Sequence, residues 1–286
     1  MLSINPKDIS TAKLHTYLLS AVAPRPIALA STIDINGNPN VSPFSFFNVF
    51  SANPPILIFS PARRVRDNST KHTLENVKAT KEVVVNMVNY NIVQQMSLSS
   101  TEYSEGVNEF EKAGFTMLAS EKVKPFRVVE SPIQLECIVN EVVELGNEGG
   151  AGNLIICEVV KLHIKEEFLD EKGAIDQQKL DLVARAGGSL YSRAKEGFFE
   201  IPKLVSTLGI GVDAIPTEIR NSTILTGNDL GMLGNVETIP SESDVNKFAK
   251  DHLQKIGDNL VKKHTFAKAF LDKNDVISAW KVLLMK

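Results

Sequence analysis

The sequence predicts a mainly β fold: an antiparallel barrel, closed or nearly closed, with peripheral helices and a C-terminal helical extension. Two strand-like runs, residues 26–33 and 39–45, flank Asn36-Gly37. That dipeptide is typical of a hairpin with a type I′ turn, which needs positive φ at both central residues. A longer hairpin is predicted at 133–166, around the glycine-rich residues 146–150. No stretch repeats the strand–helix–strand pattern of a parallel sheet.

The other elements follow from capping signals and side-chain patterns. Four potential capping residues, 67–70, precede a helical segment, and a run rich in β-branched side chains predicts a buried strand. We expect helices at 6–20 and 70–80, short strands at 56–60 and 181–184, a buried strand at 82–88, and a mostly helical layer over the barrel at 89–120.

The second run of the first hairpin carries Pro43 inside it, near the hydroxyls of Ser42 and Ser45. Proline cannot donate a ladder hydrogen bond, so this strand should lie at an edge of the sheet or break into a bulge. Backbone N–H and C=O groups would then be free, and such a surface suits a flat heteroaromatic ligand with a hydrogen-bonding edge. Four phenylalanines surround this point, most of them expected in the core: Phe44, Phe46, Phe47 and Phe50.

The long hairpin contains both cysteines, Cys137 and Cys157. A hairpin centred near Gly149 would place Cys137 opposite about Leu162, too far from Cys157 for a disulfide. We therefore expect two reduced, half-buried thiols, as in a cytosolic protein. His163 falls on the polar side of its strand and is expected to be solvated.

The net charge of −3 argues against a nucleic-acid groove, which normally needs a basic stripe. No run of 18 apolar residues predicts a membrane span, and the N-terminus lacks a basic-then-apolar leader, so we expect a cytoplasmic protein without a membrane partner. The five histidines are scattered without ligand spacing, and no metal site is predicted.

Basic residues gather just before the helix predicted at 70–80, at Arg63, Arg64, Arg66 and Lys71. Helix N-termini attract phosphates through unpaired N–H groups and a partial positive charge. The cluster therefore favours a phosphate or nucleotide as partner; a solvated basic loop and plain helix capping are the alternatives.

Several segments, in order and over roughly residues 5 to 202, resemble the flavin reductase-like family of FMN-binding split β-barrel proteins. The matching pieces share the family's residue types: Pro24-Arg25-Pro26-Ile27-Ala28, Ser31-Thr32, Asn36-Gly37, residues 42–48, Asn53-Pro54-Pro55, residues 71–76 and 83–86, Asn108-Glu109-Phe110, Ala113-Gly114, Glu130-Ser131-Pro132, Cys137, and Ala186-Gly187-Gly188 with Tyr191. The family's usual tripeptide at 71–73 is Lys-Asp-Thr, and this chain has His72 in the middle.

The resemblance implies a split barrel that binds FMN, with the phosphate at the start of the predicted helix and the ring near residues 42–48. Gly187, Gly188 and Tyr191, with Arg185, form a third candidate, for which a glycine-rich turn is the alternative. The implied cofactor-binding residues are Ser31, Thr32, Ser42, Pro43, Phe44, Ser45, Phe46, Asn48, Arg63, Lys71, Thr73, Asn76, Gly188 and Tyr191.

The implied activity is reduction of flavin by hydride from NADH or NADPH, with the donor admitted near Tyr191. Such chemistry needs no dedicated acid or nucleophile, which fits a chain without a catalytic cluster. A flavoredoxin-like FMN electron carrier, acting with an electron-accepting protein, and a non-catalytic flavin-binding module are the alternatives. Family resemblance also implies a homodimer.

The composition changes after Pro202, which divides the chain into an FMN-binding domain at 1–202 and an extension at 203–286. Residues 203–241 carry few helix signals, whereas 244–264 and 273–286 read as amphipathic helices, the first capped by Ser241 or Ser243. The extension is either a small helical subdomain or an arm that packs on a partner subunit.

Overall fold

The computed structural model describes residues 1–103, 106–204, 206–256 and 259–285. The chain divides into two compact units, Met1–Phe198 and Phe199–Lys286. No helix in the described part of the chain is long and apolar enough to cross a membrane.

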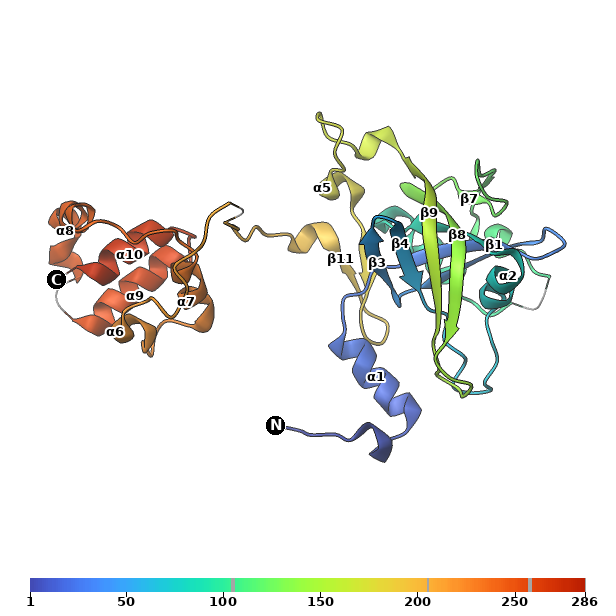
Figure 1. Ribbon diagram of the computed structural model, residues 1–286, viewed down its shortest axis with the longest axis horizontal. Coiled ribbons are helices and arrows are strands. Elements are labelled where there is room, and N and C mark those ends of the chain that lie inside the picture. The colour runs from blue at the N-terminus through green and yellow to red at the C-terminus, as the bar shows by residue number, and fades with distance from the viewer. Residues whose placement is uncertain (104–105, 205, 257–258, 286) are drawn as a thin grey trace. The chain divides into compact units, whose positions relative to one another are not determined.

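The first unit contains the barrel (Figure 1). Its strands are β1 (Ala28–Ile33), β2 (Pro39–Phe44), β3 (Phe47–Ala52), β4 (Pro55–Phe59), β5 (Glu82–Met87), β6 (Met117–Leu118), β7 (Arg127–Val128), β8 (Ile133–Glu144), β9 (Asn153–Ile164), β10 (Val183–Arg185) and β11 (Tyr191–Arg193). Its α-helices are α1 (Thr11–Ala21), α2 (His72–Thr80), α3 (Val93–Leu98), α4 (Glu109–Ala113) and α5 (Gln177–Leu180), and its 3₁₀ turns are η1 (Pro6–Asp8), η2 (Tyr90–Ile92), η3 (Glu166–Phe168) and η4 (Ala194–Gly197).

Seven strands form one antiparallel sheet in the order β2-β1-β5-β8-β9-β4-β3. β2 and β3 lie at opposite edges, although only Ser45 and Phe46 separate them in the chain. The sheet must therefore roll up, and the ring centroids of Phe44 in β2 and Phe59 in β4 lie 5.4 Å apart. The predicted antiparallel barrel is confirmed, and β2 is an edge strand, as Pro43 indicated.

The first hairpin is confirmed, but its predicted turn type is wrong. Gly37 has φ +87°, whereas Asn36 does not have positive φ. The Asp34 carboxylate accepts hydrogen bonds from the N–H groups of Asn36 and Asn38, both at 2.8 Å. The Asp34 side chain thus stabilises a longer loop with a single left-handed glycine, in place of the two-residue type I′ turn.

Helix α2 begins at His72, two residues later than predicted. Its N-cap residue is Lys71, which makes no side-chain capping bond. Asp67 instead accepts hydrogen bonds from Ser69 within the preceding loop, so the prediction that residues 67–70 cap this helix is wrong. The first N–H groups of α2 therefore keep their capacity to bind a ligand.

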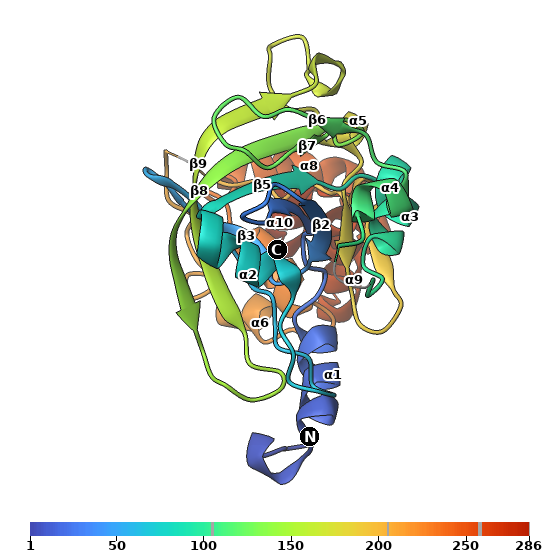
Figure 2. The same cartoon turned by 90° about the vertical axis from the view of Figure 1, so that its right-hand side faces the viewer.

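Two apolar clusters position the site. The barrel interior is filled from β1, β2, β4, β5, β8 and β9, with Leu74 and Val77 of α2 packed into it. A second cluster covers the other side of β1 and β2 with side chains of α3 and α4, such as Met96 and Phe110. Figure 2 shows α3 and α4 together at one corner of the barrel. β1 is consequently buried along its whole length.

The long hairpin is confirmed as β8 and β9, but its predicted register is wrong. Irregularities at Glu136/Cys137 and Val139/Glu141 place Cys137 opposite Val159 and Cys157 opposite Val139. The two thiols are therefore close: a hydrogen bond with Cys157, then burial, raises the pKa of Cys137 well above its ordinary value. Both are free and fully buried, not half-buried as predicted.

The second unit is a helical body with helices α6 (Thr217–Arg220), α7 (Gly227–Gly234), α8 (Glu242–Ile256), α9 (Leu260–Leu271) and α10 (Val276–Leu284). Its core surrounds Trp280, whose indole N–H donates to the Leu233 carbonyl at 3.0 Å. Ser241 accepts a hydrogen bond from the Asp244 N–H, so it is the cap of α8. The single helix predicted at 244–264 is wrong, because Asn259 caps a second helix, α9.

Candidate functional site

A buried polar network joins the start of α2 to strands β1 and β2. Thr73 Oγ1 donates to Asn40 Oδ1 at 2.9 Å, and Asn76 Nδ2 donates to Thr32 Oγ1 at 3.0 Å. Thr32 Oγ1 also lies 3.4 Å from Asn40 Oδ1. Burying polar groups is costly unless they pair, and here the pairing holds α2 in one position against the edge of the sheet.

A narrow pocket opens beside this network, between β2, the start of α2 and the segment that follows α3. The residues that line it are almost all polar or charged: Asn40, Ser42, Arg64, Lys71, His72, Thr73, Ser99, Thr101, Glu102, Tyr103 and Glu109. Several hydroxyl groups, a lysine and a helix N-terminus thus converge on one small volume.

Lys71 lines this pocket and makes no ion pair within the described residues. Burial, followed by the charge of Arg64, lowers its pKa. Arg64 itself is engaged, since it donates to Ser69 Oγ and the Thr70 carbonyl, both at 2.7 Å, and pairs with Glu102 at 2.9 Å. Among the described residues no carboxylate lies within ion-pair distance of Lys71. A half-buried ammonium that makes no direct ion pair can bind an anionic ligand.

The structure brings together residues that the sequence assigned to different parts of the ligand, since Ser42 was expected at the ring and Lys71, Thr73, Asn76 and Arg63 at the phosphate. Ser42, Lys71 and Thr73 line the pocket, and Asn76 lies behind it in the network. Arg63 does not line the pocket, because its guanidinium is bonded to the Asn68 side chain at 2.7 Å and to the Asn68 carbonyl at 2.9 Å.

Ser31 and Thr32 are fully buried and do not line the pocket. The hydroxyl of Thr32 belongs to the network described above. Ser31 Oγ has no hydrogen-bond partner among the residues that the structure describes.

Sequence reasoning missed much of the pocket wall. Asn40 could have been found, because it lies two residues before Ser42 and so projects from the same face of β2. The remaining side chains come from positions distant in the sequence, where no periodic pattern marks them: Ser99, Thr101, Glu102, Tyr103 and Glu109.

The predicted ring site is the bend between β2 and β3. Pro43 lies in the ladder opposite Leu29, and Phe44 is buried in the barrel core. Phe46 is 38% exposed at the bend itself. Asn48 accepts a hydrogen bond from the Val49 N–H at 2.8 Å.

A buried arginine ties this bend to the third candidate segment. Arg25 donates to the carbonyls of Leu19 and Val22, both at 2.5 Å, and to the Ala186 carbonyl at 3.3 Å, while its Nε lies 3.5 Å from Ser45 Oγ. The bend and the β10–β11 hairpin are therefore neighbours.

The β10–β11 hairpin presents a cation beside an aromatic ring. The Arg185 guanidinium carbon lies 4.5 Å from the centre of the Tyr191 ring, and Gly188 at the tip has φ +58°. Burial, and then the charge of Arg185, lowers the pKa of Arg25. Within the described ranges no carboxylate pairs with either arginine.

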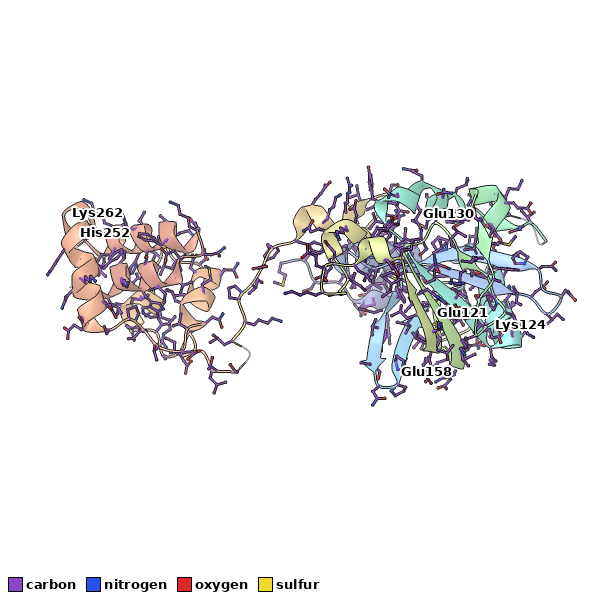
Figure 3. The ribbon with its side chains drawn as sticks, turned by 90° about the horizontal axis from the view of Figure 1, so that it is seen from above. Glu121, Lys124, Glu130, Glu158, His252 and Lys262 are labelled. Carbon is purple, nitrogen blue, oxygen red and sulfur yellow. The ribbon has the colours of Figure 1, made fainter. Side chains whose placement is uncertain are left out.

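A second buried polar cluster lies elsewhere on the barrel, and it corrects the prediction that His163 is solvated. His163 Nε2 lies 2.6 Å from Oε1 of Glu136, which is fully buried and accepts the N–H groups of residues 121–123. Glu121, labelled in Figure 3, lies 3.8 Å from the other ring nitrogen. This cluster pins a loop to the sheet and has no part in the pocket.

The donor set of the pocket fits the phosphate monoester of FMN: an unpaired lysine, serine and threonine hydroxyls, and the start of a helix. In the described part of the chain no group of three or more His, Cys, Asp or Glu side chains could hold a metal ion.

Comparisons with known proteins agree with this geometry. The family model described as flavin reductase like domain matches residues 20–181. A protein from Aquifex aeolicus is 37% identical over 188 residues, which are 66% of this chain and 93% of that protein.

Two solved structures are also similar. Nitrilotriacetate monooxygenase component B from Bacillus cereus is 29% identical, with a TM-score of 0.66 over 70% of this chain and 98% of that one. A 2-nitrobenzoate 2-nitroreductase from Pseudomonas fluorescens is 25% identical, with a TM-score of 0.63 over 73% and 100%. Since the family model covers more than half of the chain, this protein belongs to the flavin reductase like domain family, with the split barrel of that family as its first unit.

Proposed function

We propose that this protein binds FMN and reduces flavin with hydride from NADH or NADPH. The observation that carries the proposal is the half-buried ammonium of Lys71, which makes no ion pair within the described residues, beside the uncapped start of α2. Bound FMN would supply the hydride acceptor, and the chain would supply binding, orientation and electrostatics.

The phosphate would occupy the pocket at α2. Lys71 offers a point charge, and Ser42 and Thr73 offer hydroxyl groups. The network behind them keeps Thr73 fixed, so the donors need little rearrangement when the ligand binds. The flavin ring would lie toward the bend at residues 45–46, where β2 ends and its outer edge has no strand partner.

The nicotinamide donor would enter at the β10–β11 hairpin. Its pyrophosphate is anionic, and Arg185 is an unpaired cation stacked on Tyr191. Arg25 beneath it adds positive charge and holds the hairpin beside the bend. These two arginines fit the donor's charge without choosing between NADH and NADPH.

A homodimer is part of the proposal. Helix α1 has no buried residue, and it exposes Tyr17 and Leu18, while edge strand β3 exposes Val49 and Phe50. Exposed apolar side chains on an edge strand and a neighbouring helix are features of a surface that a second copy covers. Light scattering on the purified protein would give twice the chain mass of 31.4 kDa.

Lys71→Ala tests the phosphate site. Because a hydrogen bond to a charged group contributes about 1.5–3 kcal/mol, FMN affinity should fall about 10- to 100-fold. Riboflavin, which lacks the phosphate, should bind equally to both proteins. Lys78→Ala is the matched control, since Lys78 lies near the other end of α2 and pairs with Glu144 at 2.6 Å. Equal losses for FMN and riboflavin would contradict the assignment.

Rapid mixing with NADH or NADPH tests the reaction. Bleaching of bound flavin followed by turnover of excess free FMN supports a reductase. Reduction that is passed on only to an added partner protein supports an electron carrier instead. A flavin that neither nicotinamide nor a partner reduces would leave a binding module without this activity.

A further inference from the structure

Glu109 is a buried carboxyl group in the wall of the phosphate pocket. It is the first residue of α4 and only 6% exposed. Helix α4 packs against the edge strand β2, and the Asn40 side chain and the Val41 N–H act to lower the pKa of the Glu109 carboxyl group. Its Oε2 atom, however, has no hydrogen-bond partner among the described residues.

The charged and titratable groups around Glu109 come from three elements. Lys71 and His72 lie at the start of α2, Arg64 in the loop before it, and Glu102 and Tyr103 after α3. Burial raises the pKa of Glu109, and its hydrogen bonds and the charge of His72 oppose that rise only in part. A bare carboxylate oxygen here would repel a phosphate dianion, whereas a protonated carboxyl is a hydrogen-bond donor.

On the basis of the phosphate pocket proposed above, we propose that Glu109 takes up a proton from solvent when FMN binds and donates it, as a hydrogen bond from Oε2, to a phosphate oxygen. The proton stays on the carboxyl group and no covalent bond forms. The unpartnered buried oxygen thereby gains a partner, and the like-charge repulsion is removed. Binding of FMN is then linked to one proton.

Two chemistries could satisfy Oε2, and they differ in the sign of the pH effect. A protonated Glu109 that donates to phosphate makes FMN affinity fall as pH rises, by at most about tenfold per pH unit, because one proton is linked. An ionised Glu109 that accepts from a ribityl hydroxyl would make affinity rise with pH and would affect riboflavin equally. Because Lys71 and Glu109 line the same pocket, a phosphate bound by Lys71 would lie near Oε2, and its negative charge favours the first.

The test is calorimetric titration of FMN into the full chain, in two buffers that differ in ionisation enthalpy, at about pH 7.5, above the second phosphate ionisation near 6. Wild-type protein should take up about one proton per FMN. Glu109→Gln keeps an acceptor for Val41 and places an N–H₂ donor at the pocket. It should take up none and show an affinity that does not fall above neutral pH. Glu111→Gln, an exposed position on the same helix, is the matched control and should behave as wild type.

Each outcome decides a different point. FMN binding without proton uptake in the wild type overturns the role of Glu109 and leaves the proposed function standing. A wild-type protein that binds no FMN overturns the proposed function itself. An equal effect of Glu109→Gln on FMN and riboflavin would assign the oxygen to ribityl hydroxyls. The wild-type measurement alone decides the proton count if the variant fails to fold, which circular dichroism would reveal.

Discussion

The two units of this protein bury different kinds of side chain. The barrel buries Thr32, Asn40, Thr73 and Asn76 together at one corner. The core of the helical unit is apolar around Trp280, although Asp229, Lys263 and His264 are also buried in this unit. A buried polar network adds little net stability, because desolvation offsets its hydrogen bonds. The contrast suggests that the barrel corner is shaped for binding and the helical core for stability.

Trp280→Ala should have the largest effect, a loss of stability in the helical unit. Truncating a fully buried tryptophan costs about 3–5 kcal/mol, and it also leaves the Leu233 carbonyl without its donor. Hydrogen exchange should show the loss in α7, α9 and α10, with barrel strands unchanged. FMN affinity should not change. Loss of FMN binding would show that the two units are energetically coupled, and it would contradict the separate roles given to the barrel corner and the helical core.

Glu136→Gln asks whether every buried polar cluster of the barrel serves binding. The Glu136 carboxylate accepts hydrogen bonds from three backbone N–H groups and is paired with His163. The side-chain N–H₂ of Gln would face these N–H groups, which should lower the free energy of unfolding by about 2–3 kcal/mol. FMN affinity should remain that of wild type, because this cluster is separate from the pocket. A variant with weakened FMN binding would contradict that separation.

The same residue predicts a pH dependence. Burial raises the pKa of Glu136, but hydrogen bonds from residues 121 and 122 and from His163 outweigh it, so the pKa is below 4.5. A depressed pKa gives stability that is full above the unfolded value and is lost as pH falls through the folded one. The difference in the free energy of unfolding between wild type and Glu136→Gln, measured with urea, should therefore become smaller as the pH is lowered.

Local signals in the sequence predicted the elements well. Asn36-Gly37 marked the hairpin, and Pro43 marked an edge strand, because each acts through its own backbone. Lys71 and Thr73 were predicted together because both lie at the start of a predicted helix, whereas Ser42, which lines the same pocket, was predicted at the flavin ring.

The predictions that were wrong concern features that depend on contacts that no local pattern encodes. The Asp34 side chain selects the turn type, and the observed register of the β8–β9 ladder, with its shifts, gives Cys137 a different partner from the predicted one. Glu109 entered the pocket from a remote segment, and His163 met a buried carboxylate only after the sheet had formed. Tertiary packing, not propensity, fixes these positions.

Asn76→Ala tests whether the buried polar network of the barrel supports FMN binding as well as stability. It removes the donor to the buried Thr32 hydroxyl and should cost about 1–3 kcal/mol, measured by urea unfolding. Because the network positions Thr73, FMN affinity should also fall, while riboflavin affinity changes less. Trp280→Ala shows the reverse pattern, so the pair forms a direct contrast. A stability loss with unchanged FMN affinity would mean that the network does not support the phosphate pocket.

Thr226→Ala gives the smallest expected effect and tests the rim of the helical unit. Thr226 caps α7: its Oγ1 accepts the Asp229 N–H at 3.3 Å, and Asp229 accepts the Thr226 N–H at 2.7 Å. Losing such a cap costs about 1 kcal/mol. Thr226→Ser keeps the hydroxyl and should retain most of that stability in the same unfolding measurement. If both variants matched wild type, helix ends in this unit would contribute nothing, and its stability would reside in the apolar core alone.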